Sequence, residues 1–132
     1  MKLVEELKID HENLLAVLTR IREIGKKDEE VIQLLQNVKT LLISHLKKED
    51  AKLYPALKKA AEIDKKLRLM LDLFASDMEE VTETALVFFD KHAGALAVQN
   101  ESNFHEDLDL LCIVLAKGIE NEETKLYPEY LY

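Results

Sequence analysis

Helix breakers are scarce in this sequence: three glycines and two prolines interrupt 132 residues. A chain with so few breakers has little room for the many turns that an all-β fold needs. Between the breakers, apolar residues recur every three or four positions, which is the period of one face of an α-helix. The sequence therefore predicts an all-α fold.

The first half of the chain contains two such periodic stretches. The first starts at Leu3 and stops at Gly25. The second follows Asp28, a residue type that caps helix N-termini, and runs on to Tyr54 and Pro55. Because proline lacks the backbone donor of a helix interior, Pro55 should kink or end the second helix.

The second half repeats this organisation. A third periodic stretch starts near Asp64 and ends in a loop at His92-Ala93-Gly94, and a fourth follows the candidate cap Ser102. Four helices joined by short links predict an antiparallel up-down-up-down four-helix bundle. We expect residues 1–132 to form one domain.

Charge and composition exclude several classes of partner. Lys and Arg total 18 against 26 Asp and Glu, a net charge of −8, and no basic cluster suits nucleic acid or an anionic membrane. Charges in every turn of the N-terminal segment argue against a signal peptide or a membrane span. The single cysteine, Cys112, excludes an internal disulfide framework. We therefore expect a cytoplasmic protein, either a monomer or a homodimer.

Four polar side chains lie on stripes that are otherwise apolar. His11 lies on the stripe of the first helix, and His45 and Glu49 continue the stripe of the second, four residues apart. Glu122 continues the stripe of the fourth helix. A repeat, EDAKLYP at 49–55 and EETKLYP at 122–128, places Glu49 and Glu122 at the same level of the bundle.

Two carboxylates in a dry core need compensation, because burying each charge costs several kcal/mol. Two neutral imidazoles and two carboxylates carry a charge of −2, which a divalent cation cancels. Mixed nitrogen and oxygen ligands suit iron, manganese or zinc better than calcium or magnesium. The sequence therefore predicts a metal site formed by His11, His45, Glu49 and Glu122. The alternative is a metal-free hydrogen-bonded network that fixes the helix register.

These residues resemble the pattern of the hemerythrin family, specifically the bacterial hemerythrin-like HHE cation-binding domains. The resemblance lies in three segments: His11-Glu12, His45-x3-Glu49-Asp50-x2-Leu53-Tyr54-Pro55, and Glu122-Glu123-x2-Leu126-Tyr127-Pro128. It implies a four-helix bundle that usually holds two irons. It also implies that His11 and His45 belong to the first metal position, with Glu49 and Glu122 as bridges.

Two ligand positions of the family are missing here. The family places histidines on the third helix, where this chain offers Phe74, Met78 and Val81. The family also has a histidine where this chain has Gly118, which should leave room for solvent or a small ligand. Three arrangements are open: one metal on the four predicted residues, two metals with Asp77 as a substitute ligand, or a metal-free bundle. We favour the first.

The resemblance implies a non-haem iron protein that binds a small diatomic ligand, O2 or NO, or that handles iron. Loss of the second iron's histidines argues against oxygen carriage, which uses both irons in the family. A metal-free structural or signalling module is the alternative. A metal-dependent oxidase or peroxidase is the third possibility, but no acid–base residue can be assigned to it, so we expect no enzyme.

Other polar residues receive no metal role. We expect His92 and His105 to be solvated. Tyr54 and Tyr127 should pack at the bundle end and bond a carbonyl group.

Overall fold

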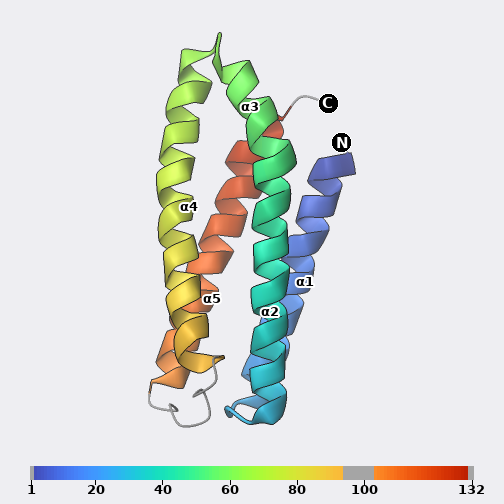
Figure 1. The fold of residues 1–132 in the computed structure, drawn as a ribbon, viewed down its shortest axis with the longest axis vertical. Helices are drawn as coiled ribbons and strands as arrows, with labels where there is room; N and C mark the ends of the chain where they lie inside the picture. The colour runs from blue at the N-terminus through green and yellow to red at the C-terminus, as the bar shows by residue number, and fades with distance from the viewer. Residues whose placement is uncertain (1, 94–102, 131–132) are drawn as a thin grey trace.

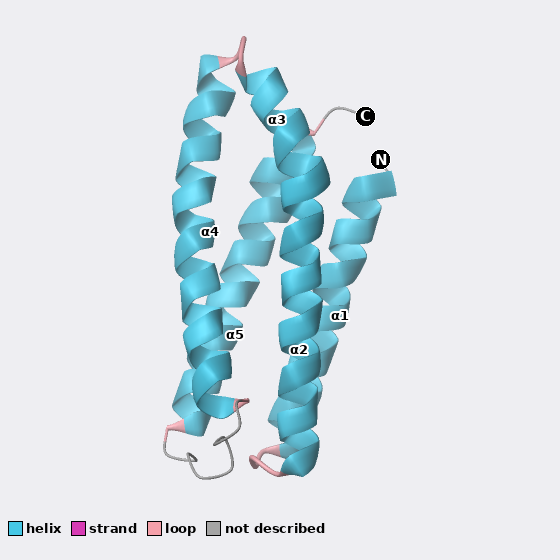
Figure 2. Ribbon diagram, viewed as in Figure 1, coloured by secondary structure: helices cyan, strands magenta, loops and turns pink. Residues whose placement is uncertain are grey.

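The computed structural model of the protein describes residues 2–93 and 103–130. In these residues four long helices run alternately up and down (Figure 1): α1 (Lys2–Ile24), α2 (Glu29–Lys48), α4 (Lys65–His92) and α5 (Phe104–Asn121). The described residues contain no strand (Figure 2). The predicted all-α up-down-up-down bundle is confirmed. None of the described helices combines the length and the apolar character needed to cross a membrane.

The core consists of two apolar clusters with a polar level between them. One cluster includes Leu14, Leu42 and Leu115, and the other includes Leu7, Leu53 and Leu126. Along each helix the buried polar residues lie between the two clusters: His11 on α1, His45 and Glu49 along the second helical segment, and Glu122 after α5. Apolar packing therefore closes the polar level from both ends of the bundle.

The predicted starts of α2 and α4 are confirmed by their caps. Asp28 Oδ1 accepts the Val31 N–H at 2.9 Å, and Asp64 Oδ1 accepts the Leu67 N–H at 3.1 Å. Gly25 ends α1 with a φ of 72°, a left-handed conformation that glycine adopts without strain.

The predicted start of the last helix falls on a different residue. Ser102, the expected cap, lies outside the described residues, as does Gly94 of the expected loop. Asn103 precedes α5 with a φ of 67° and makes no side-chain cap. Asparagine is one of the few residues other than glycine that tolerate this conformation.

Pro55 kinks the second helix but does not end it. After α2 the chain makes a five-residue π-helical turn, η1 (Glu49–Leu53), and continues as α3 (Tyr54–Ala61), which leans away from the line of α2 (Figure 1). Pro55 falls in the first turn of α3, the helical position at which proline is best tolerated. With the π turn before it, the chain accommodates Pro55 and remains helical as far as Ala61.

The repeated segment forms the same local structure a second time. The turn η3 (Glu122–Leu126) is also π-helical and is followed by a 3-10 turn, η4 (Tyr127–Glu129). In both copies the tyrosine N–H bonds the carbonyl of a glutamate five residues earlier. A π turn adds one residue to a helical turn and is frequent at functional sites. Both turns lie at the polar level of the core.

His92 is buried, so the expectation that it is solvated is wrong. It continues the α4 stripe four residues after Phe88, and its side chain is 0% exposed. Lys27 Nζ donates to His92 Nδ1 at 3.0 Å, and His92 Nε2 donates to Asp107 Oδ2 at 2.8 Å. This network ties the α1–α2 turn to α4 and α5. His105 is exposed, as expected.

The burial of His92 predicts a pH-dependent contribution to stability. Burial lowers the pKa of His92 below 6.5, although the bond to Asp107 acts in the opposite direction. The unfolded chain therefore takes up a proton first as the pH falls, and the free energy of unfolding should decrease below about pH 6.5. His92→Gln should weaken this dependence between about pH 7.5 and about pH 5.5 in urea titrations. An unchanged dependence in the variant would contradict the assignment.

Candidate metal centre

The structure brings the four predicted residues to one level of the bundle. His11 comes from α1, His45 from α2, Glu49 from the first π turn and Glu122 from the second. Their residues are 2%, 2%, 0% and 3% exposed, respectively. Each therefore occupies the inward position that its stripe predicts.

Three of these side chains converge closely. His11 Nε2 lies 3.1 Å from both His45 Nε2 and Glu122 Oε1. One nitrogen or oxygen atom from each of the three lies within 4.8 Å of the others, which is the spacing of ligands around one ion. Glu49 adjoins this group, because its Oε2 lies 3.5 Å from His45 Nε2. Ligation of a metal by all four residues stays a prediction.

Two further carboxylates, which the sequence did not reveal, orient the histidines. His11 Nδ1 lies 2.6 Å from Glu123 Oε2, and His45 Nδ1 lies 3.0 Å from Asp10 Oδ2. An ionised carboxylate only accepts hydrogen bonds, so each Nδ1 carries the proton and each Nε2 presents a lone pair. Metal-binding histidines are usually held in this way.

When both imidazoles are neutral, the inward-facing atoms of this group are all acceptors. With both Nδ1 atoms protonated, two Nε2 lone pairs and one carboxylate oxygen face one another, and only a proton or a cation among them relieves the repulsion. Burial would lower the pKa of His45, but its bonds to Glu122 and Glu49 raise it to about 10. The group therefore has a high affinity for positive charge.

The carboxyl groups of Glu49 and Glu122 are both buried, but their pKa values shift in opposite directions. Burial raises the pKa of Glu49 to about 7, and the neighbouring Glu122 adds to this effect. Burial would also raise the pKa of Glu122, but hydrogen bonds from His11 and His45 hold it at about 2. At neutral pH Glu122 is therefore ionised and Glu49 is close to its pKa, so a cation beside them would favour the ionised form of both.

Three buried polar atoms of the described residues have no hydrogen-bond partner: Glu49 Oε1, Glu122 Oε2 and Tyr54 Oη. Burial of a carboxylate oxygen without a partner is costly, and native cores avoid it. A coordinated cation would remove this cost. The donor set and its unpaired oxygens therefore fit a metal ion.

Tyr127 belongs to the same group, although the expected carbonyl partner was wrong. Its hydroxyl donates to Glu49 Oε2 at 2.9 Å and lies 3.3 Å from His11 Nε2. Its ring stacks on the His11 imidazole, with centroids 5.7 Å apart and planes at 9°. Tyr127 therefore contacts both a carboxylate and an imidazole of the predicted site. The hydroxyl of Tyr54 also lacks the expected carbonyl partner.

The α4 side of the group differs from what the sequence suggested. Asp77, the suggested substitute ligand, is exposed on α4 and lies outside the group. A Cβ added at Gly118 would lie 3.6 Å from Val81 Cγ2, an ordinary van der Waals contact, so Val81 adjoins Gly118 and the expected room for solvent or a small ligand stays a prediction. Near Gly118 this side of the polar level is therefore lined by an apolar residue.

Comparison with models of protein families places the chain in a family. The family model of the Hemerythrin HHE cation binding domain matches residues 2–130. No curated protein and no solved structure matches the chain. The matched range includes every residue of the group described above.

The carboxylate behind His45 can be tested without touching a predicted ligand. Asp10→Asn should weaken zinc or iron binding by roughly 10–100-fold, because the imidazole loses the charge that orients it. Glu12→Gln removes an equal charge from an exposed position of α1 and is the matched control. Chelator competition gives both dissociation constants. Equal affinity in the two variants would contradict the role of Asp10.

Proposed function

Since the chain belongs to the hemerythrin HHE cation-binding family, we propose that it is a non-haem iron protein whose metal is held by His11, His45, Glu49 and Glu122. The observation that supports this most is the convergence of two Nε2 atoms and Glu122 Oε1 within 4.8 Å in the buried core. In the described residues no lysine or arginine side chain is bonded to these three atoms, so a cation is the natural occupant.

Iron suits this donor set because it accepts imidazole nitrogen and carboxylate oxygen together. Two neutral imidazoles and two carboxylates cancel the charge of a divalent ion. Zinc and manganese fit the same charge and similar donors, and one or two ions per chain are compatible with the residues present. Metal analysis of the purified protein decides among them.

We assign the bound iron to sensing of O2 or NO, or to iron handling. Iron supplies the redox-active centre at which a small diatomic ligand binds. The two apolar clusters exclude water from this level, Asp10 and Glu123 hold the imidazoles, and Tyr127 places a hydroxyl donor beside them. Oxygen carriage and catalysis are weaker proposals, because α4 offers Phe74 and Val81 where the family has histidines.

Two accompanying proposals concern the setting of the protein. Cys112 is a free thiol, which suits the reducing cytoplasm. The exposed apolar residues of α4 and α5, such as Leu73 and Ile113, are compatible with either a monomer or a homodimer.

Removal of one predicted ligand tests the metal assignment. His45→Ala should reduce the metal content per chain close to zero, because the site loses a donor nitrogen, while circular dichroism keeps its helical signal. His105→Ala changes an exposed histidine and should keep the wild-type metal content. The protein is purified without chelator or affinity metal and measured by elemental analysis. An unchanged content in His45→Ala would refute the site.

The alternative is a metal-free structural module. It is favoured by hydrogen bonds that already join the helices, including His11 to Glu123 and His45 to Asp10. Prolonged chelation separates the two proposals. The metal protein should lose thermal stability, because bound metal contributes to folding, whereas the structural module should keep its melting temperature.

A further inference from the structure

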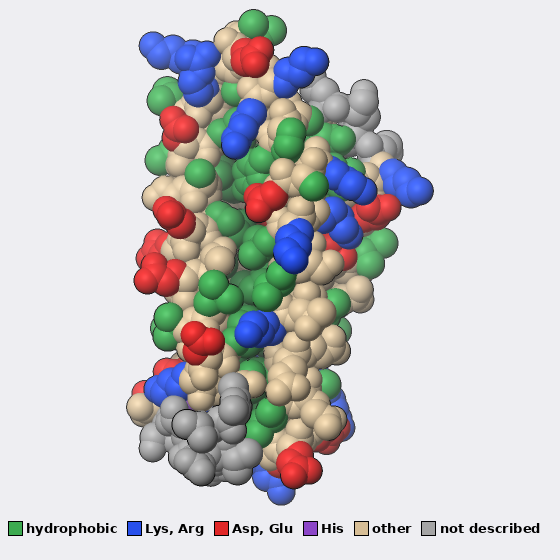
Figure 3. All heavy atoms as spheres, viewed as in Figure 1, with side chains coloured by type: hydrophobic (Ala, Val, Ile, Leu, Met, Phe, Trp, Pro, Cys, Tyr) green, Lys and Arg blue, Asp and Glu red, His purple; other side chains and the backbone are tan. Residues whose placement is uncertain are grey.

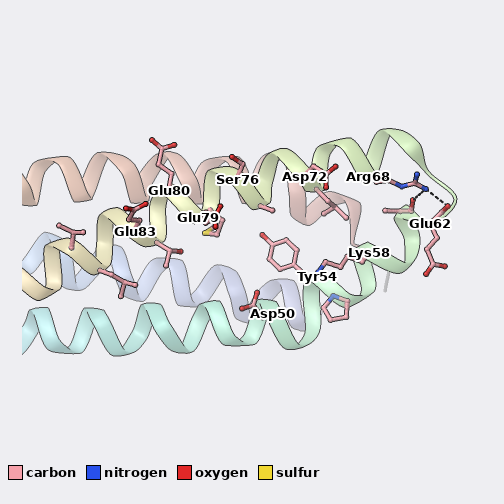
Figure 4. Close-up of a pocket in the computed structure, with 18 of the residues that line it drawn as sticks. Asp50, Tyr54, Lys58, Glu62, Arg68, Asp72, Ser76, Glu79, Glu80 and Glu83 are labelled. Atoms are coloured by element: carbon pink, nitrogen blue, oxygen red, sulfur yellow. Dashed lines mark hydrogen bonds between the residues drawn. The ribbon is translucent and has the colours of Figure 1, made fainter.

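A groove runs along one face of the bundle, between α4 and the segment that follows α2 (Figure 4). One wall is formed by α4 from Arg68 to Asp90, and the other by the turn η1 and α3 from Asp50 to Glu62. Its volume of about 1500 Å³ exceeds the range of about 300–1,000 Å³ that is usual for small-molecule sites. The α4 wall is about 33 Å long at the helical rise per residue. The groove therefore has the dimensions of a site for a polypeptide segment.

The groove contains an apolar stripe that follows the helical spacing of α4. Leu71, Ala75, Met78 and Leu86 line it at intervals of four, three and eight residues, which places them on one flank of the helix. Leu86 is 42% exposed and the adjoining Val87 is 61% exposed, so this stripe extends to the surface. Figure 3 shows hydrophobic side chains in a column along this face. Ridges of side chains with this spacing are the surface against which another helix packs.

The charges around the groove are predominantly acidic. Seven acidic residues and two basic ones, Lys58 and Arg68, line it. The Arg68 guanidinium donates to the carbonyl oxygens of Ala61 and Glu62 at 3.2 and 3.0 Å, so it is engaged at the α3–α4 turn. Acidic side chains lie along the α4 edge of the same face (Figure 3). The groove therefore has an apolar stripe with a negative edge beside it.

The acidic edge has no positive partner of its own. Glu79 and Glu83 lie four residues apart on α4, and both are exposed. Neither forms an ion pair within residues 2–93 and 103–130. Like charges at this spacing destabilise a helix, and a positive group placed beside both of them removes the repulsion. The edge is therefore complementary to lysine or arginine side chains.

We propose that this groove binds a basic amphipathic helix of a partner protein. Apolar side chains of the partner pack on the stripe of α4, and its lysine or arginine side chains pair with the acidic edge. A helix suits the groove better than an extended strand, because the described residues offer no sheet edge for a strand to pair with. A second copy of this chain is a poor occupant, because it brings a net charge of −8 to an acidic edge. The proposal uses none of the predicted metal ligands, so it does not depend on the proposed function.

Binding of a synthetic peptide to the full chain tests the proposal. The probe is a fluorescein-labelled peptide of about 18 residues, which forms a helix about 27 Å long, with leucine on one face and lysine on the other. Fluorescence anisotropy should show one peptide bound per chain, with an affinity that falls as salt is added. A peptide with glutamate in place of each lysine should bind at least about tenfold more weakly, because its charges repel the acidic edge.

Charge reversal on the protein locates the binding surface. Glu79→Lys combined with Glu83→Lys should weaken binding of the lysine peptide at least about tenfold. Glu12→Lys combined with Glu23→Lys is the matched control, since it changes the net charge equally at exposed positions of α1 outside the groove. The control should keep an affinity close to that of the wild type. Circular dichroism establishes that both variants are folded.

Three results would overturn the proposal. The first is that the wild type does not bind the lysine peptide. The second is equal weakening by the two pairs of substitutions, which would attribute binding to the net charge of the chain and not to the groove. The third is a stable wild-type dimer in analytical ultracentrifugation that excludes the peptide, which would make a second copy of the chain the occupant.

Discussion

Burial of two carboxyl groups at one level of the core is the constraint on which the rest of the structure depends. Glu49 and Glu122 are fully buried between two apolar clusters, where water cannot solvate them. The histidines compensate the buried carboxyl groups only in part. Asp10 and Glu123 hold a proton on the Nδ1 atom of each imidazole, which faces away from the carboxyl pair. The inner surface of the site is therefore rich in lone pairs, and a cation is the group that balances it.

The π turns connect this chemistry to the local sequence. A glutamate opens each turn, a buried leucine closes it, and a tyrosine and a proline follow. The proline prevents a regular helix from continuing, and the wider turn accommodates it by bonding over five residues. The same widening sets Tyr127 across the bundle from its own glutamate, so that it contacts Glu49. The π turn therefore has two roles: it accommodates the proline, and it positions the glutamate and tyrosine side chains of the site.

Periodicity predicted the parts of the molecule that follow a regular helix. It placed His11, His45, Glu49 and Glu122 inward because each continues an apolar stripe. Asp10 and Glu123 escaped prediction because they lie off the stripes, toward a neighbouring helix, and their only signal is that each adjoins a predicted residue. The π turns were not predicted, because a single added residue does not show in the three-to-four-residue spacing of apolar positions. His92 was predicted to be solvated because it adjoins a predicted loop, although it continues the apolar stripe of α4 four residues after Phe88.

The two halves of the bundle share the repeat but differ in the helix that each repeat faces. On one side α1 supplies His11, which meets His45, Glu122 and the hydroxyl of Tyr127. On the other side α4 supplies no histidine to this group, and Val81 lies beside Gly118. Nitrogen donors therefore gather on one side of the carboxyl pair, and unpaired oxygens remain around it. The repeated motif therefore produces a chemically asymmetric centre. Each half of the chain supplies one of the carboxyl groups, whereas both histidines come from the first half.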